Sequence, residues 1–380
     1  MIRFKSIFTL LLLMGSIPLL VSCKETVIEE ENELWNDSEI IAMEAPEVEI
    51  SDLEFSEIPF KKISEYGFFR GKLNELEVTD KVLIYEPASS LFTDYAFKSR
   101  YIWMPEGRSA SILEDKEGTM EFPDQTIIIK NFYYPIDFRN PEGTKRILET
   151  RLLVKKDGVW DAYPYIWKDD QSDAEYKVVG AEKKVNWVDP KGEMQVINYI
   201  VPNKNQCKSC HNVNEVMAPI GVKAKHLNHE FNYGEETVNQ LVQWEKSGYL
   251  SGLKYPVAVY PSMVDYNDPS QDLNLRALAY LDINCAHCHR AEGPASTSGL
   301  FLTYEERDSL KLGVNKTPVA AGFGAGSFKY DIIPGKADQS ILTYRMESTQ
   351  VGAAMPEIGR VMTHHEGVEI IKSWINSMKK

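Results

Sequence analysis

The sequence predicts an α+β, multidomain fold in which a mainly antiparallel, sandwich-like β domain precedes two all-α domains. Residues 58–201 are rich in runs of β-branched and aromatic side chains, which are typical of strands. Two copies of the motif Cys-x-x-Cys-His follow, and apolar side chains recur at helical spacing over residues 366–378. We therefore expect one β domain over residues 58–201 and two helical domains over residues 202–269 and 270–380.

The N-terminus resembles that of a bacterial lipoprotein. Residues 1–22 begin with Arg3 and Lys5 and continue into an apolar run, which is the pattern of a signal peptide. The run is short and interrupted, so it does not favour a membrane span. It ends in Leu20-Val21-Ser22-Cys23, which resembles a lipobox, in which the cysteine is acylated after cleavage. We predict a signal peptide over residues 1–22 and lipid attachment to Cys23.

The segment that follows Cys23 is strongly acidic. Residues 24–57 contain 13 acidic side chains and one basic side chain, whereas the net charge of the whole chain is −14. Most of the net charge therefore lies in this segment, which we interpret as an extended, self-repelling linker. We predict a lipidated acidic tether over residues 23–57 that holds the folded part away from a membrane.

The predicted location is the bacterial cell envelope. The lipid on Cys23 would anchor the chain to a membrane, and Cys23-Lys24-Glu25 resembles the acidic export signal of some surface lipoproteins. We expect a membrane-anchored lipoprotein that is either periplasmic or exposed at the surface of the outer membrane. The chain has no basic cluster of the kind that binds nucleic acid.

Four runs predict strands in the β domain, namely residues 126–133, 146–154, 158–167 and 194–201. The turn signal Lys155-Lys156-Asp157-Gly158 indicates a hairpin between two of them. All seven histidines lie at or after position 211, so this domain lacks histidine ligands for a metal site of its own. We interpret it as a docking or structural module. Its aromatic side chains favour packing, and stacking on a glycan is the alternative.

Two five-residue motifs are the most informative feature of the chain: Cys207-Lys208-Ser209-Cys210-His211 and Cys285-Ala286-His287-Cys288-His289. Cys-x-x-Cys-His is the attachment motif of c-type haem, in which two thiols bond to the porphyrin and the histidine binds the iron. Zinc ribbons space their cysteine pairs about 15–20 residues apart, and neither zinc nor disulfides explain a histidine after both pairs. We predict two covalently bound haem c groups. The predicted thioether residues are Cys207, Cys210, Cys285 and Cys288, and the predicted axial residues are His211 and His289.

The sixth iron ligands are less constrained by the sequence. In small cytochromes c, a methionine from a late loop usually fills this position. Met355, just before the closing helix, is the candidate for the second haem, whereas Met346 lies in a predicted helix and suits a core role. Met263 is the preferred candidate for the first haem, with Met217 and His226 as alternatives. If all of these side chains face away, that iron is five-coordinate and open to a small ligand.

Further segments carry a resemblance to a known family. They are Phe122–Thr126, Lys130, Phe132, Glu149–Leu153, Val201-Pro202, Pro219–Gly221, Leu227-Asn228, Asn239–Leu241, Arg276–Asp282, Pro334-Gly335, Ser340, Leu342, Arg345, Met355-Pro356 and Gly359-Arg360. With the two motifs, the chain resembles a family of largely uncharacterised bacterial diheme c-type cytochromes with a β-rich N-terminal part. The resemblance implies the domain order given above and supports Met355 as a ligand.

The predicted function is electron transfer by a diheme c-type cytochrome lipoprotein, which exchanges electrons with redox partner proteins at the cell envelope. One alternative is a diheme peroxidase-like oxidoreductase with one open haem, although no acid–base residue is convincingly assigned to a pocket. A second alternative is a redox-linked binding protein whose β domain holds a partner or a glycan.

Overall fold

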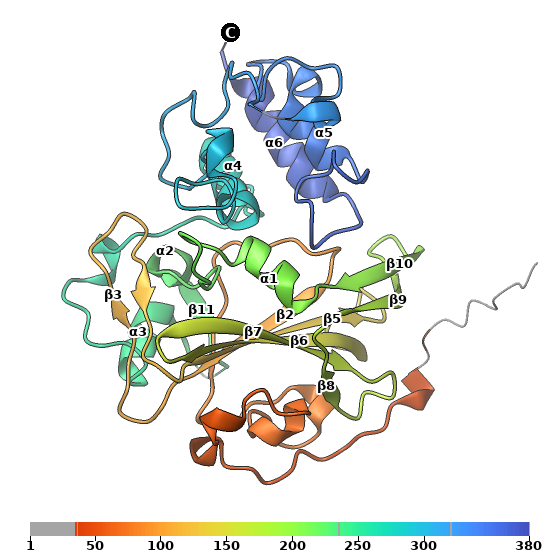
Figure 1. Ribbon diagram of the computed structural model, residues 1–380, viewed down its shortest axis with the longest axis vertical. Coiled ribbons are helices and arrows are strands. Elements are labelled where there is room, and N and C mark those ends of the chain that lie inside the picture. The colour runs from red at the N-terminus through yellow and green to blue at the C-terminus, as the bar shows by residue number, and fades with distance from the viewer. Residues whose placement is uncertain (1–34, 36, 235, 320, 380) are drawn as a thin grey trace, which may run out of the picture. The chain divides into compact units, whose positions relative to one another are not determined.

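A six-stranded antiparallel sheet lies at the centre of the part of the chain that the structure describes (Figure 1). The computed structural model describes residues 35–380 apart from positions 36, 235, 320 and 380, so the predicted signal peptide and Cys23 lie outside the described residues. The strands occur in the order β1-β2-β5-β6-β7-β8. They are Leu83–Ile84 (β1), Phe97–Trp103 (β2), Ile127–Pro135 (β5), Lys145–Lys156 (β6), Val159–Trp167 (β7) and Ala174–Tyr176 (β8).

Three two-stranded sheets and six short α-helices complete the regular structure of the described residues. The two-stranded sheets pair Ser111–Ile112 (β3) with Met120–Glu121 (β4), Ala181–Val188 (β9) with Met194–Val201 (β10), and Glu230–Asn232 (β11) with Thr237–Asn239 (β12). The helices are Lys204–Cys210 (α1), Ala224–Leu227 (α2), Gln240–Lys246 (α3), Leu273–Leu281 (α4), Ile341–Glu347 (α5) and His365–Ser377 (α6).

The two faces of the large sheet are covered by different parts of the chain. One face, with Ile129, Leu152 and Tyr165, packs against the N-terminal segment between residues 50 and 82. The other face packs against the segment of the first motif and against the β9–β10 ribbon. Side chains alternate between the faces because successive residues of a strand point in opposite directions. The aromatic side chains of β7 are buried in these layers, which agrees with packing rather than with a glycan surface.

The prediction of two all-α domains after the β domain is wrong. The structure is mostly β, and the region after residue 201 contains only short helices joined by long irregular segments. The sequence signals for helices were local, and the chain between α4 and α5 is interrupted repeatedly by glycine and proline, which end helices. Residues 35–380 form one compact unit, and the boundaries at residues 202 and 270 stay predictions.

The predicted acidic tether lies partly within the described residues. Backbone hydrogen bonds join Ile41 to Asp170 and Ala45 to Gly71, and Ile50 is buried in the core beneath the sheet. This part of the segment therefore contacts the fold.

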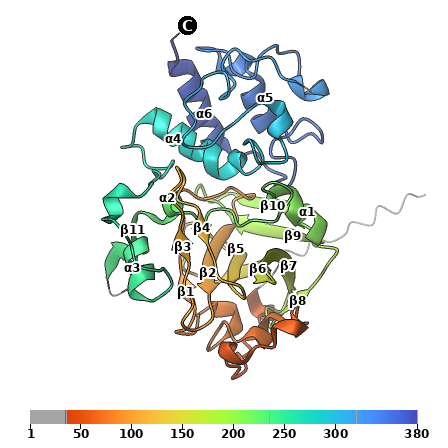
Figure 2. The same cartoon turned by 60° about the vertical axis from the view of Figure 1, so that its left-hand side comes forward.

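The C-terminal helices α4 and α6 pack directly on one another above the sheet (Figure 2). Gly367 of α6 faces Tyr280 of α4 so closely that a Cβ atom there would lie 2.2 Å from the Tyr280 ring. Glycine is therefore required at this crossing. The helical periodicity predicted over residues 366–378 corresponds to α6.

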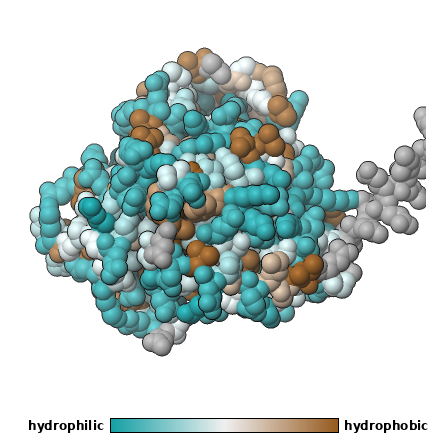
Figure 3. All heavy atoms as spheres, turned by 60° about the horizontal axis from the view of Figure 1, so that its bottom comes forward, coloured by the Kyte–Doolittle hydropathy of each residue, from teal (hydrophilic) through white to brown (hydrophobic). Residues whose placement is uncertain are grey.

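One face of the described residues is mostly polar. The face in Figure 3 carries hydrophilic side chains with scattered apolar ones between them. Among the described residues, the helices are too short or too polar to cross a bilayer.

Candidate functional site

Helix α1 carries the first motif. Asn203 caps the helix, because its side chain accepts a hydrogen bond from the Gln206 backbone and the Gln206 side chain bonds back to Asn203. The helix ends at His211, whose Nδ1 lies 2.9 Å from the Ala218 carbonyl. Such a bond fixes the ring and leaves Nε2 as the nitrogen for a metal. Burial is the main cause that lowers the pKa of His211 to about 4, so the imidazole is neutral at pH 7.

The second motif follows α4 through a wide helical turn over Asp282–Ala286. The Oγ atom of Ser298 lies 3.3 Å from Nδ1 of His289 and orients that ring in the same way. Burial, with smaller contributions from neighbouring charges that include Arg345, lowers the pKa of His289 to about 4. Both motifs therefore present a neutral histidine.

The two motifs line one shared cavity of about 500 Å³. All four motif cysteines have free thiols. The motif side chains in the wall are Cys207, Cys210, His211, Cys285, Cys288 and His289. The structure therefore brings together every residue predicted to hold haem through a thioether or a proximal bond.

The shared cavity has apolar walls interrupted by six cationic side chains and by the carboxylates of Asp331 and Glu357. The apolar part includes Ile128 and Leu153 of the sheet and Leu300 and Leu302 beyond the second motif. The cations in the wall are Arg100, Lys130, Arg151, Lys316, Arg345 and Arg360. An apolar slot with basic side chains fits a haem, which is a flat apolar ring carrying two carboxylates. The cavity residues therefore fit the predicted group.

The two motifs meet at Cys210 and Cys288. These two sulfur atoms and a ring nitrogen of His287 lie within 4.8 Å of one another. The three side chains could hold a single metal ion, but such a site would leave Cys207, Cys285 and both proximal histidines without a role. The contact shows instead that the two predicted attachment sites adjoin.

Met355 lies in the wall of the shared cavity, as does Met346. Arg360 fixes the Met355 loop by donating hydrogen bonds to the carbonyls of Met355 and Ser348, both at 2.8 Å. The loop is therefore held in place independently of any ligand. Met355 stays the predicted sixth ligand of the second haem.

The three candidates for the first haem lie elsewhere. Met263 and Met217 are buried in separate hydrophobic clusters, and neither is part of the cavity wall. His226 has both ring nitrogens engaged, because Nδ1 accepts a hydrogen bond from the Lys223 backbone and Nε2 contacts Asp282 at 3.2 Å. The geometry thus gives none of them direct access to the shared cavity.

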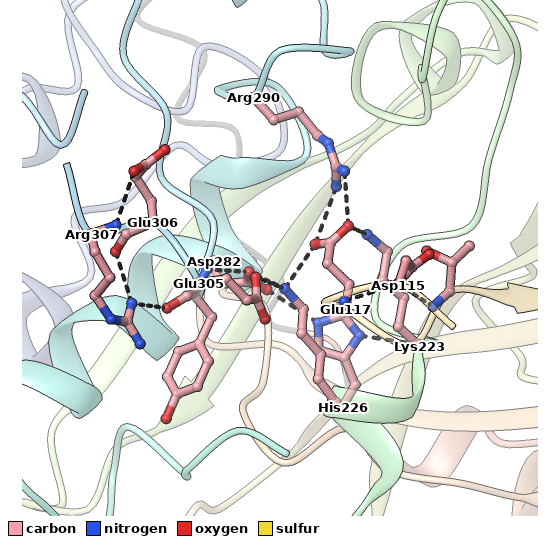
Figure 4. A network of polar contacts seen from close by, with 12 residues as sticks. Asp115, Glu117, Lys223, His226, Asp282, Arg290, Glu305, Glu306 and Arg307 are labelled. Carbon is pink, nitrogen blue, oxygen red and sulfur yellow. Dashed lines mark hydrogen bonds and ion pairs between the residues drawn. The ribbon is translucent and has the colours of Figure 1, made fainter. Parts of the chain in front are cut away.

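A buried ion-pair network lies beside the motifs (Figure 4). Its centre is Lys225 of α2, which is 1 % exposed and whose Nζ contacts Asp282 at 2.5 Å, Glu117 at 2.8 Å and Glu305 at 3.1 Å. Lys223 and Arg290 also bind Glu117. The network borders a second cavity of about 230 Å³, which Cys210 and His287 also line.

The network sets the charge of its carboxylates. Burial alone would raise the pKa of Asp282, but the charge of Lys225 and a hydrogen bond with His226 lower it well below the ordinary range. Glu117 shows the same balance, because Lys225, Lys223 and Arg290 outweigh its burial. Both carboxylates are therefore ionised in the folded protein at neutral pH.

Sequence reasoning missed this network and the cations of the sheet. Lys225, Asp282 and Glu117 are far apart in the chain, so their pairing has no local signal. Lys130 lies in a predicted strand, and a single lysine within a strand is ordinarily expected to be exposed to solvent. Only the register of the sheet places it beside other cations.

Comparisons with known proteins found no match among family models, curated proteins or solved structures.

We predict that Lys225→Met lowers the free energy of unfolding by about 3 kcal/mol, because it leaves the buried Asp282 carboxylate without its main cation. Chemical denaturation at pH 7 measures this loss. Lys254→Met is the control, since Lys254 pairs with Glu114 at an exposed site, and its unfolding transition should not move. Equal effects of the two substitutions would contradict the role of Lys225.

The same network predicts an acid dependence. The folded pKa values of Asp282 and Glu117 are depressed, so their stabilisation is complete above the unfolded pKa values of about 4 and is lost as pH falls further. The unfolding free energy of the wild type should fall between pH 5 and about pH 2, and Lys225→Met should show a shallower fall. Parallel pH profiles for the two proteins would rule out this assignment.

We predict that Met355→Leu removes the weak far-red absorption band of methionine bound to ferric haem, because leucine keeps the volume but has no sulfur. Met346→Leu is the matched control and should keep the band. The presence or absence of this band is measured in optical spectra of the oxidised proteins. A band that survives Met355→Leu and disappears in Met346→Leu would assign the ligand to Met346.

Proposed function

We propose that the chain is a diheme c-type cytochrome that carries electrons at the bacterial cell envelope. The observation that supports this most strongly is the convergence of both Cys-x-x-Cys-His motifs on one apolar cavity with cationic side chains. Four free thiols and two neutral histidines face the cavity, and each histidine is oriented through its Nδ1. These are the groups that covalent haem attachment requires.

In this proposal Cys207, Cys210 and His211 hold the first haem, and Cys285, Cys288 and His289 hold the second. Each bound haem supplies an iron that takes up and releases one electron. The chain supplies the axial histidines, excludes water with the apolar walls and balances the carboxylates with buried cations.

The adjoining motifs suit transfer between two sites within one molecule. Cys210 and Cys288 belong to different motifs, and their sulfur atoms lie within 4.8 Å of each other. Two attachment sites this close make a short internal path for electrons. We propose that one site exchanges electrons with a donor protein and the other with an acceptor.

The proposed location rests on the N-terminal sequence. A lipid on Cys23 would anchor the chain to a membrane, with the folded part in the periplasm or at the outer surface. The attachment of c-type haem takes place outside the cytoplasm in bacteria, so the anchor and the cofactor agree.

One observation favours a second candidate function. Met263, Met217 and His226, the predicted sixth ligands of the first haem, do not line the shared cavity. An iron without a sixth protein ligand is open to a small molecule such as peroxide, which is the requirement of a diheme peroxidase-like oxidoreductase.

The optical spectrum separates the two functions. The chain is produced in a host with haem c maturation machinery, and spectra are recorded in the oxidised and reduced states. We expect reversible reduction of both haems and no turnover of peroxide. A high-spin component together with peroxide turnover would overturn the electron-carrier proposal in favour of the enzyme.

A further inference from the structure

Three cationic side chains form a row across the large sheet. Arg100 of β2 is the register partner of Lys130 of β5, and Lys130 is in turn the partner of Arg151 of β6. Like charges directly opposite one another on neighbouring strands destabilise a sheet. All three side chains lie on the face that borders the shared cavity, where Arg100 is buried and Lys130 and Arg151 are part-buried.

The two outer cations are compensated. Arg100 pairs with Glu86 at 2.6 Å. Arg151 binds both carboxylate oxygens of the fully buried Glu149, at 2.6 and 2.7 Å. Each end of the row therefore has its own anion.

The central cation is not compensated. Among the described residues, Lys130 has no hydrogen-bond or ion-pair partner for its ammonium group, and its recorded contact is the Phe132 ring at 5.0 Å. Lys98, on the neighbouring strand, differs because its Nζ donates to the Ala96 carbonyl at 2.7 Å. An unpaired ammonium in an apolar cavity is costly, so the position of Lys130 points to an anion that the protein itself does not supply.

The row lies on the side of the first motif. Cys207 packs in one hydrophobic cluster with Ile128 of β5 and Leu153 of β6, which lie on the same face of the sheet as the row. Cys285 of the second motif packs instead against the cluster formed by α4 and α6. The first motif is therefore the one that packs on the strands of the row.

We propose that Lys130 binds a carboxylate of the haem attached to Cys207 and Cys210, and that the large sheet forms one wall of that haem site. This inference rests on the proposed haem attachment. This inference gives the large sheet a role in the haem site, because helix α1 provides only the side of the site that carries the proximal histidine.

The test uses the holoprotein and three substitutions. Lys130→Gln removes the charge, Lys130→Arg keeps it, and Lys98→Gln removes a nearby charge that does not line the cavity. A positive charge beside a haem carboxylate favours the reduced state. We expect Lys130→Gln to lower the equilibrium constant for reduction of one haem about tenfold, a shift of about 59 mV for one electron. Lys130→Arg and Lys98→Gln should change it less than threefold. Lys130→Leu removes the same charge and replaces the glutamine variant if that variant does not fold.

The outcomes separate this inference from the proposed function. If the wild type carries haem on Cys207 and Cys210 but Lys130→Gln keeps both potentials, the inference is wrong and the haem assignment stands. If both Lys130→Gln and Lys130→Arg change the low-spin spectrum of one haem, Lys130 is an iron ligand, because an always protonated arginine cannot replace it there. If the wild type carries no haem on the first motif, the proposed function itself fails.

Discussion

The buried ion-pair network around Lys225 joins the chain segments next to the two motifs. Asp282 lies three residues before Cys285, Glu117 belongs to the β3–β4 hairpin, and Lys225 belongs to the helix that follows the first motif. One ammonium group therefore joins three segments that lie far apart in the sequence. Because Lys225 and Asp282 are buried and Glu117 is mostly so, the loss of the Lys225 charge leaves buried carboxylates without compensation. In this arrangement, Cys210 lies next to Cys288.

The large sheet takes part in the site as well as in the core. Its first face packs on the N-terminal segment in the ordinary way, whereas its second face carries cations toward the cavity. A buried row of like charges is unfavourable for the sheet alone. An anionic group bound in the cavity would offset the repulsion between these cations, and the carboxylates of the proposed haem are such a group.

The sequence predicted the local features of the molecule well. Runs of β-branched residues marked β5, β6, β7 and β10, and the apolar periodicity of residues 366–378 marked α6, because these patterns depend on neighbours along the chain. The two motifs were assigned to separate domains, whereas the structure places them around one cavity. The prediction of two all-α domains failed because short helical signals were extended into whole domains, whereas glycines and prolines interrupt the segments between them.

The remaining features depend on distant partners. The register of β2, β5 and β6 places Arg100, Lys130 and Arg151 in one row, and no single strand reveals this. In the same way, Lys225 and Asp282 are 57 residues apart in the sequence and pair only in the folded chain. The sequence alone therefore could not show whether Lys130 faces solvent or the cavity, because this depends on the segments that pack over the sheet.

Covalent attachment of haem to both motifs is tested by the intact mass of the denatured protein after production in a host with haem c maturation machinery. We expect a mass that includes two haem groups, and one haem group when either cysteine pair, Cys207 with Cys210 or Cys285 with Cys288, is replaced by serine. A wild-type mass without haem, with the four thiols free to react with an alkylating agent, would show that the motifs do not hold haem.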